Sequence, residues 1–132
     1  MHGSNVGVVH TIKTAAGVSP IPVASAGTVY TPAFVLGFAE SFGVGLLATS
    51  DGTVDVLVEL EESMTEPTSE AADVDCVEPD GFADVLNLTN ELMHIKQITP
   101  VPAKYGRFKL TGQGANHAST TVRIELFLQE SL

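Results

Sequence analysis

Two stretches of this chain alternate apolar and polar residues with a period of two, and this pattern limits the fold more than any other feature. In residues 54–61 every second side chain is aliphatic, and the positions between them are mostly acidic. Residues 122–129 repeat the pattern, with aliphatic side chains at the even positions. Successive side chains of a β-strand point to opposite faces, so each stretch predicts a strand with one face in a hydrophobic core.

Six further segments have the composition of strands, because they are rich in Val, Ile, Phe, Tyr and Thr. They are residues 5–13, 27–31, 34–38, 43–49, 92–99 and 105–111, divided by proline- and glycine-containing turns. Strands at such short spacing predict an all-β protein, an antiparallel β-sandwich or jelly roll. Residues 81–93 carry apolar side chains at helical spacing, so we expect at most one short helix, in that segment.

Two connections have distinct compositions. Ser50, Asp51 and Gly52 favour a tight turn, which is predicted to join residues 43–49 to residues 53–61 as a hairpin. Residues 63–80 are acidic, contain two prolines and offer little to bury, so they predict a long exposed loop. A chain of 132 residues fits one domain, 1–132, with residues 1–17 able to extend as an N-terminal arm.

The charges are segregated along the chain. No lysine or arginine lies between Lys13 and Lys96, yet fourteen of the sixteen carboxylates lie from Glu40 to Glu91, and the net charge is -10. Neutralising a nucleic acid backbone requires clustered cations, so this composition excludes nucleic acid as a partner. Residues 31–49 are weakly polar, but a proline and a glutamate interrupt them, so no membrane helix is expected. The N-terminal residues lack the pattern of a signal peptide, so we expect the protein to be made and kept in a cytoplasm.

The sequence contains no recognisable catalytic or metal motif. The four histidines share no ligand spacing, and residues 73–81 depart from the calcium-loop pattern at its third ligand. Cys76 has acidic neighbours, which would raise its thiol pKa, so we predict a structural cysteine. Asp55 and Glu59 share one face of a predicted strand and are interpreted as its wet side. We therefore expect neither an enzyme nor a bound cofactor.

Residues 105–123 combine aromatic and basic side chains with a polar, glycine-containing loop. The period of two places Tyr105, Arg107 and Lys109 on one face of a strand, and Phe108 and Leu110 on the core side. Residues 112–120 are small and polar, and they suit either a contact loop or a plain connection between strands. Six residues of this region are candidates for contact with another protein: Tyr105, Arg107, Lys109, Gln113, Asn116 and His117.

Two stretches, residues 50–61 (SDGTVDVLVELE) and residues 102–116 running into the closing strand that ends at Gln129 and Glu130, carry a family resemblance. Together they resemble the small all-β virion structural proteins of tailed bacteriophages, in particular those that decorate or cement the capsid. The resemblance implies a sandwich or jelly roll that forms a homotrimer at threefold and quasi-threefold positions of the shell. It also implies that the major capsid protein is the partner and the capsid surface the location, and it implies no catalytic residues.

The expected function is therefore that of a capsid decoration protein, which binds the outside of a phage head and stabilises contacts between major capsid subunits. One alternative is a structural component of the phage tail, neck or baseplate. Another is a glycan- or host-surface-binding module, although the chain has no tryptophan and only two tyrosines for stacking on sugars. An enzyme is the least expected of these classes.

Overall fold

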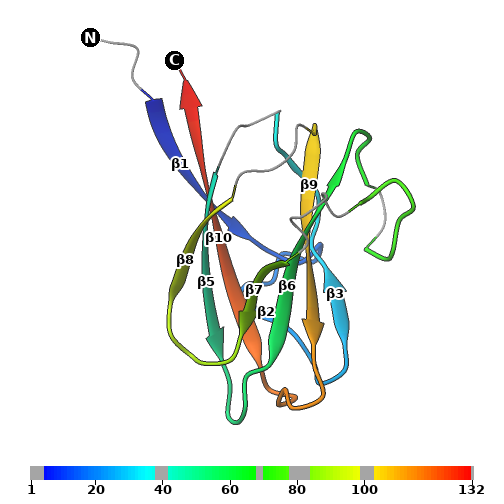
Figure 1. Cartoon of the computed structure of the whole chain (residues 1–132), viewed down its shortest axis with the longest axis vertical. Helices are drawn as coiled ribbons and strands as arrows, with labels where there is room; N and C mark the ends of the chain where they lie inside the picture. The colour runs from blue at the N-terminus through cyan, green and yellow to red at the C-terminus, as the bar shows by residue number, and fades with distance from the viewer. Residues whose placement is uncertain (1–4, 38–41, 68–69, 78–83, 99–102, 132) are drawn as a thin grey trace.

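The computed structural model describes residues 5–37, 42–67, 70–77, 84–98 and 103–131. In this part of the chain every regular element is a β-strand, in the order β1 (Asn5–Ile12), β2 (Ile21–Pro22), β3 (Thr28–Tyr30), β4 (Phe34–Val35), β5 (Phe42–Thr49), β6 (Val56–Ser63), β7 (Asp84–Leu88), β8 (His94–Ile98), β9 (Tyr105–Gly112) and β10 (Thr121–Ser131). The strands form two antiparallel sheets packed together (Figure 1). The predicted fold class, an antiparallel β-sandwich, is confirmed.

The two sheets mix strands that are distant in sequence. Sheet A has the order β1-β10-β5-β8, and β2 also pairs with β10. Sheet B has the order β3-β9-β6-β7, and β4 also pairs with β9. The central strands of both sheets are therefore supplied by the two periodic stretches, β6 and β10, together with β5 and β9.

The core lies between the two sheets and is built as the alternation predicts. Val56, Val58 and Leu60 of β6 are fully buried, as are Val122 and Ile124 of β10. Phe108 and Leu110 of β9 are buried with them, which confirms their predicted place in the core. The rings of Phe34 and Phe108 lie 5.4 Å apart, and this contact packs β4 against β9.

The predicted hairpin at residues 50–52 is wrong. β5 belongs to sheet A and β6 to sheet B, so this turn carries the chain from one sheet to the other. Each strand finds its partners elsewhere: β5 pairs with β10 and β8, and β6 pairs with β9 and β7. Gly52 is needed for space, because a Cβ there would come within 2.6 Å of the His117 ring.

The short helix allowed for residues 81–93 does not form where the structure describes this segment, since residues 84–88 form β7. This strand pairs with β6, with Leu86 opposite Val58 and Leu88 opposite Val56. Leu88 is fully buried, so pairing against a central strand overrides the weak helical spacing. Residues 81–83 lie outside the described residues, and the two-residue strand β2 was not anticipated from the sequence.

The first and the last strand lie side by side. β1 pairs with β10 of its own chain along its full length, from Asn5 opposite Ser131 to Ile12 opposite Ile124, and the pair extends beyond the rest of the sandwich (Figure 1). Within the predicted acidic loop, residues 70–77 are largely exposed, and Val77 forms an isolated bridge with Glu62. Residues 68–69 and 78–80 of that loop lie outside the described residues.

Candidate docking face

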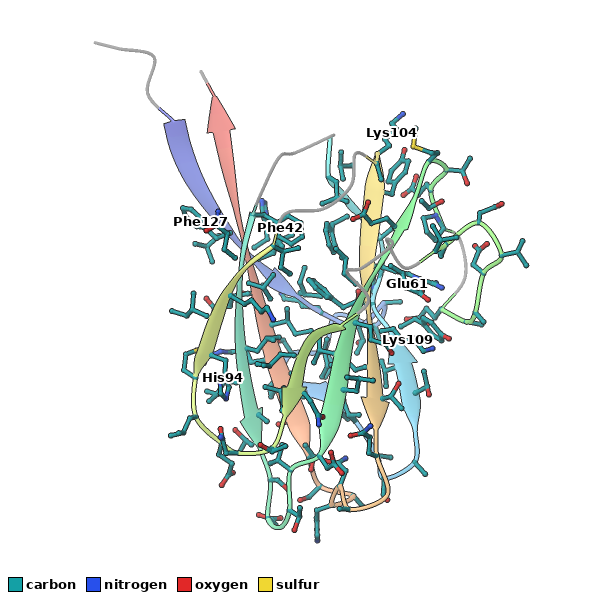
Figure 2. The ribbon with its side chains drawn as sticks, in the orientation of Figure 1. Phe42, Glu61, His94, Lys104, Lys109 and Phe127 are labelled. Atoms are coloured by element: carbon teal, nitrogen blue, oxygen red, sulfur yellow. The ribbon has the colours of Figure 1, made fainter. Side chains whose placement is uncertain are left out.

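The outer face of sheet A carries a group of exposed large hydrophobic side chains. The register places Val9 opposite Phe127, Phe127 opposite Gly43, and Gly45 opposite Ile95, so these residues share one face of the sheet. Ile95 is 83% exposed, the largest exposure in the group. Figure 2 shows Phe127 on the side of sheet A that faces away from sheet B, whereas Phe42 of β5 points toward the core.

Two glycines make this face concave. Gly43 and Gly45 alternate with buried residues of β5, so the outward positions of that strand lack side chains here. The result is a hollow of about 420 Å³, lined by Val9, Gly43, Val44, Gly45, Met93, Ile95, Glu125 and Phe127. We call the outward-facing part of this set, Val9, Gly43, Gly45, Met93, Ile95, Glu125 and Phe127, the docking face.

The docking face carries almost no net charge, although the chain is strongly acidic. Its carboxylate, Glu125, forms an ion pair with Arg123, two residues away, with 3.1 Å between Arg123 Nε and Glu125 Oε1. The residues paired next to Glu125 and Phe127 on the neighbouring strands are uncharged. They include Thr11 beside Glu125, the two glycines, and Gln97 beside Gly43. A neutral apolar patch on a molecule of charge -10 is the type of surface that binds another protein.

The outer face of sheet B has a different construction. Glu61 of β6 lies opposite Arg107 of β9, and Glu59 lies opposite Lys109, so acidic and basic residues alternate across the two strands. The Arg107 Nε donates to Glu61 Oε1 at 2.9 Å, and its guanidinium lies 4.4 Å from the centre of the Tyr30 ring. Glu61 and Lys109 can be followed on neighbouring strands in Figure 2.

The interpretation of Asp55 and Glu59 as the wet side of a strand is wrong for Glu59, which is buried. The polar face of β6 is covered because it pairs with the cations of β9 instead of facing water. The charges of Arg107 and Glu61 also act on the Cys76 thiol, so Cys76 lies near this face. The outer face of sheet B is thus satisfied from within the chain.

The six residues predicted to contact a partner do not form one patch. Tyr105, Lys109 and Gln113 are half-buried and His117 is exposed, so these four remain predictions. Arg107 and Asn116 are buried; Asn116 accepts from the Asp55 amide at 3.1 Å and donates to the Val23 carbonyl at 3.0 Å. β9 runs from Tyr105 to Gly112, so Tyr105 and Gln113 lie about 25 Å apart.

The loop after β9 is tied to the connection between β5 and β6. The Gln113 amide donates to the Asp55 carbonyl and the His117 amide to the Thr53 carbonyl, both at 2.8 Å. Ser119 Oγ accepts from the Asp51 amide at 2.9 Å. The loop therefore has a structural function, and its use as a contact surface stays a prediction.

Cys76 and the possible metal ligands were two further candidates for chemistry in the sequence. Burial raises the pKa of the Cys76 thiol, Arg107 lowers it, and Asp73 raises it further. The direction agrees with the prediction from its acidic neighbours, although burial is the larger cause. In the part of the chain that the structure describes, no three histidine, cysteine or carboxylate side chains are grouped to hold a metal ion. Nor does any helix there have the length and hydropathy to span a membrane.

The docking face was missed in the sequence, although one signal for it is present. Gly43 and Gly45 stand at alternate positions of a predicted strand, and glycine in a strand often marks a place where another chain or ligand approaches. What the sequence does not give is the register that places β1, β10, β5 and β8 side by side, and hence Val9, Phe127 and Ile95 around the two glycines.

Comparison with known proteins shows no family for this chain. No protein-family model and no curated protein matches this chain. Among solved structures, the chain is similar to the Yersinia pseudotuberculosis-derived mitogen, with a TM-score of 0.38 and 8% sequence identity, over 96% of this chain and 86% of that chain. A likeness at this level carries no argument about function.

Proposed function

We propose that this protein is a non-catalytic structural subunit that docks on a larger assembly through the outer face of sheet A. More specifically, it is a capsid decoration protein of a tailed bacteriophage, which binds the outside of the head and holds neighbouring major capsid subunits together. The observation that carries the proposal is the docking face, a neutral, hollowed, apolar surface on a chain of charge -10. The phage assignment rests in addition on the resemblance of residues 50–61 and 102–116 to virion proteins.

The chemistry of the docking face defines its partner. Glu125 is the charged member of the face, and the neighbouring Arg123 offsets its charge, so the face offers little attraction to a basic or an acidic ligand. The hollow over Gly43 and Gly45 fits an apolar side chain that protrudes from an otherwise neutral protein surface. Other ligands are disfavoured by the rest of the molecule, because its excess of carboxylates repels phosphate and acidic surfaces.

Binding in several copies suits such a face. A single patch of this size supplies modest affinity, but a homotrimer would present it three times, and linked contacts bind far more tightly than one. A sandwich with a continuous buried core is rigid, so little ordering entropy is lost when it docks. Both properties suit a subunit that bridges the seams of a shell.

The alternative of a glycan-binding module is less well supported. Sugar sites generally use the open face of an aromatic ring for stacking, but Tyr30 is already covered by Arg107 at 4.4 Å, and Lys104 lies 5.5 Å from the centre of the Tyr105 ring. Tyrosine faces available to a sugar are therefore scarce in this structure. A glycan array with no binding would agree with this reasoning.

The test is to mix the purified protein with phage shells that lack it, and to locate the bound copies by cryo-electron microscopy. We expect added density at threefold positions of the shell, with sheet A facing the capsid subunits. Ile95→Asp protein, applied under the same conditions, should leave the shell bare. Density confined to the neck or tail would replace decoration by the tail-component alternative, and wild-type protein that leaves every shell bare would contradict the proposal.

A further inference from the structure

Glu62 occupies a position that the pattern of its strand reserves for a hydrophobic residue. It continues the inward-facing row of β6 after Val56, Val58 and Leu60. Its side chain is only 2% exposed. Neither of its carboxylate oxygens has a hydrogen-bond partner in the structure, so the carboxyl is buried without any of the interactions that normally stabilise its charge.

The Glu62 carboxyl lies beside a pocket of about 270 Å³ at the edge of the core. Ser63, Met64, Thr65, Asp75, Val77 and Ala103 line this pocket together with Glu62. The Ser63 and Thr65 hydroxyls lie 3.4 Å from one another, at hydrogen-bonding distance. The remaining walls are mainly apolar, so the pocket offers the carboxylate no substitute for water.

Residues 70–77, which we call the latch, border this pocket through Asp75 and Val77. The Glu62 amide donates to the Val77 carbonyl at 2.8 Å, and the Val77 amide donates to the Glu62 carbonyl at 2.9 Å. At its other end the latch is linked to the N-terminal part of the chain, where the Ala15 amide donates to Glu70 Oε1 at 3.2 Å. Its side chains are otherwise largely exposed, so the latch is a local unit that can open without disrupting the core.

The charges around Glu62 do not compensate an ionised carboxylate. On its own strand Glu59 and Glu61 are acidic, and the latch adds Asp73 and Asp75, of which Asp75 lines the pocket. Arg107 of β9 is the cation nearest in the register, and it pairs with Glu61, whose side chain lies on the opposite face of β6. The Cys76 thiol of the latch, whose pKa burial raises, is influenced by Arg107 and Glu61 on that opposite face. Burial raises the pKa of Glu62 from 4.5 to about 7.

A metal ion does not explain the pocket. Calcium takes six to eight oxygen ligands, whereas the pocket offers the carboxylates of Glu62 and Asp75 and two hydroxyls that already face one another. No cluster of three acidic, histidine or cysteine side chains was found among the described residues. The buried carboxyl is better explained as a group that binds a proton.

We propose that the latch is a pH-sensitive switch, which closes over Glu62 while this carboxyl is protonated and opens when it ionises. The direction of the pH effect follows from the linkage between proton binding and latch closure. A closed latch raises the pKa, so the closed form binds the proton more tightly and is favoured most at low pH. The free energy that proton binding contributes to the closed form declines as the pH rises from about 4.5 and is lost above about 7. Opening exposes the edge of β6 beside Val77 and frees the acidic latch to contact another molecule.

The switch can be tested by hydrogen exchange of the full-length protein over a pH series, with each rate corrected for its intrinsic pH dependence. The reporters are the Glu62 and Val77 amides, which form the bridge. We expect their protection to fall on the order of a hundredfold between about pH 4.5 and pH 7 and then to level off. The Gln113 amide, which donates to Asp55 elsewhere in the fold, should lose no more protection than the lower free energy of unfolding accounts for, and should stay better protected than the bridge amides at neutral pH. Equal protection of Gln113 and the bridge amides at neutral pH would mean global unfolding and would overturn a local switch.

Glu62→Gln is the matched variant, because it keeps the shape of the side chain and cannot ionise. In this variant the bridge amides should keep the same protection across the pH range, and a fall equal to that of the wild type would contradict the proposal. Asp75→Asn, which changes the other carboxyl of the pocket, should retain most of the wild-type response. Should Glu62→Gln not fold, the side-chain carboxyl carbon of Glu62 in the wild type can be titrated by NMR. A midpoint near 4.5 in place of about 7 would overturn the switch.

Discussion

The outer faces of the two sheets each carry an arginine–glutamate pair, and the two pairs differ in burial and in placement: Arg107 and Glu61 join two strands of sheet B, whereas Arg123 and Glu125 lie on one strand of sheet A. On sheet B, Arg107 contacts Glu61 at 2.9 Å, with 1% and 12% of the side chains exposed. On sheet A, Arg123 contacts Glu125 at 3.1 Å, with 43% and 37% exposed. The first pair is nearly buried, whereas the second is partly exposed to solvent. A similar distance therefore represents two different interactions.

The difference shows that the outer faces of the two sheets have different roles. The face of sheet B is completed by its own residues, since Tyr30, Arg107 and the β6 carboxylates cover one another. The face of sheet A is left incomplete, with Phe127, Ile95 and Val9 exposed around two glycines. A surface satisfied within the chain stabilises the monomer, whereas an apolar surface left open is available to a partner. The proposed function follows from this contrast.

The largest expected effect comes from replacing the arginine of each ion pair by alanine. Arg107→Ala leaves the Glu61 carboxylate nearly buried without its cation, so we expect a loss of about 3–5 kcal/mol in the free energy of unfolding. Arg123→Ala removes an exposed ion pair and should cost about 0–1 kcal/mol. Urea denaturation of the two variants at one pH measures both values.

A double-mutant cycle with Glu61→Ala separates the pair from the other contacts of Arg107. The coupling energy between Arg107 and Glu61 should exceed that between Arg123 and Glu125, which Glu125→Ala provides as the matched cycle. Equal couplings would mean that burial does not distinguish the two faces.

The second prediction concerns the acid that sheet B buries without a partner. Glu62 has its pKa raised to about 7 in the folded protein, so it binds a proton more tightly than in the unfolded chain. The stability that this provides is complete below about pH 4.5 and is lost as the pH rises to about 7, which amounts to about 2–3 kcal/mol. Glu62→Met should therefore be more stable than the wild type at about pH 8, with a flatter stability profile.

Thermal and urea unfolding at several pH values, followed for both proteins, provides the measurement. The difference in the free energy of unfolding between Glu62→Met and the wild type should widen from acid to neutral pH. A difference that stays constant would show that Glu62 is not the titrating group.

The third prediction concerns the docking face itself. Ile95→Asp and Phe127→Asp each place a charge on an exposed apolar side chain, so stability should change by only about 0.5 kcal/mol. Binding to shells that lack the protein should weaken about 30-fold or more, because a charge at the centre of an apolar contact must be desolvated. Co-sedimentation with shells measures the binding.

Val35→Asp is the matched control for these variants. Val35 is an exposed valine on β4, a strand of sheet B, and lies outside the docking face. This variant should bind shells as the wild type does. Loss of binding in Val35→Asp, or its retention in Ile95→Asp, would move the contact away from sheet A.

Much of the fold could be predicted because the period-two pattern is a local property. The alternation in residues 54–61 and 122–129 identifies the central strands and the core residues Val56, Val58, Val122 and Ile124. Phe108 was assigned to the core for the same reason. The choice of partner for each strand is not local, so the hairpin between β5 and β6 is predicted wrongly, and residues 84–88 form β7 where the sequence allowed a short helix.

The candidate site was less predictable, because it depends on contacts that sequence spacing does not show. Arg107 looked like a surface cation, but Glu61 and Tyr30 from other strands bury it. Asn116 looked like a loop residue able to contact a partner, but it joins Asp55 to Val23. Glu62 continues the inward row of β6, and the alternation alone would have placed it in the core; its acidic side chain gave no reason to expect that.

The smallest expected effect, and the one most specific to the hollow, comes from its glycine floor. Gly43 has no positive φ, and a Cβ there would meet the Phe127 Cβ at an ordinary 3.7 Å, so Gly43→Ala should fold without strain. Removing a glycine from a strand stabilises it by about 0.5–1 kcal/mol. The same methyl group occupies part of the hollow, so shell binding should weaken by a few fold.

On sheet B, Gly112→Ala should instead destabilise the fold, because its Cβ would overlap the Ala24 carbonyl oxygen. Only a functional hollow on sheet A makes stability and binding change in opposite directions, and unchanged binding in a stabilised Gly43→Ala would show that the partner does not enter it.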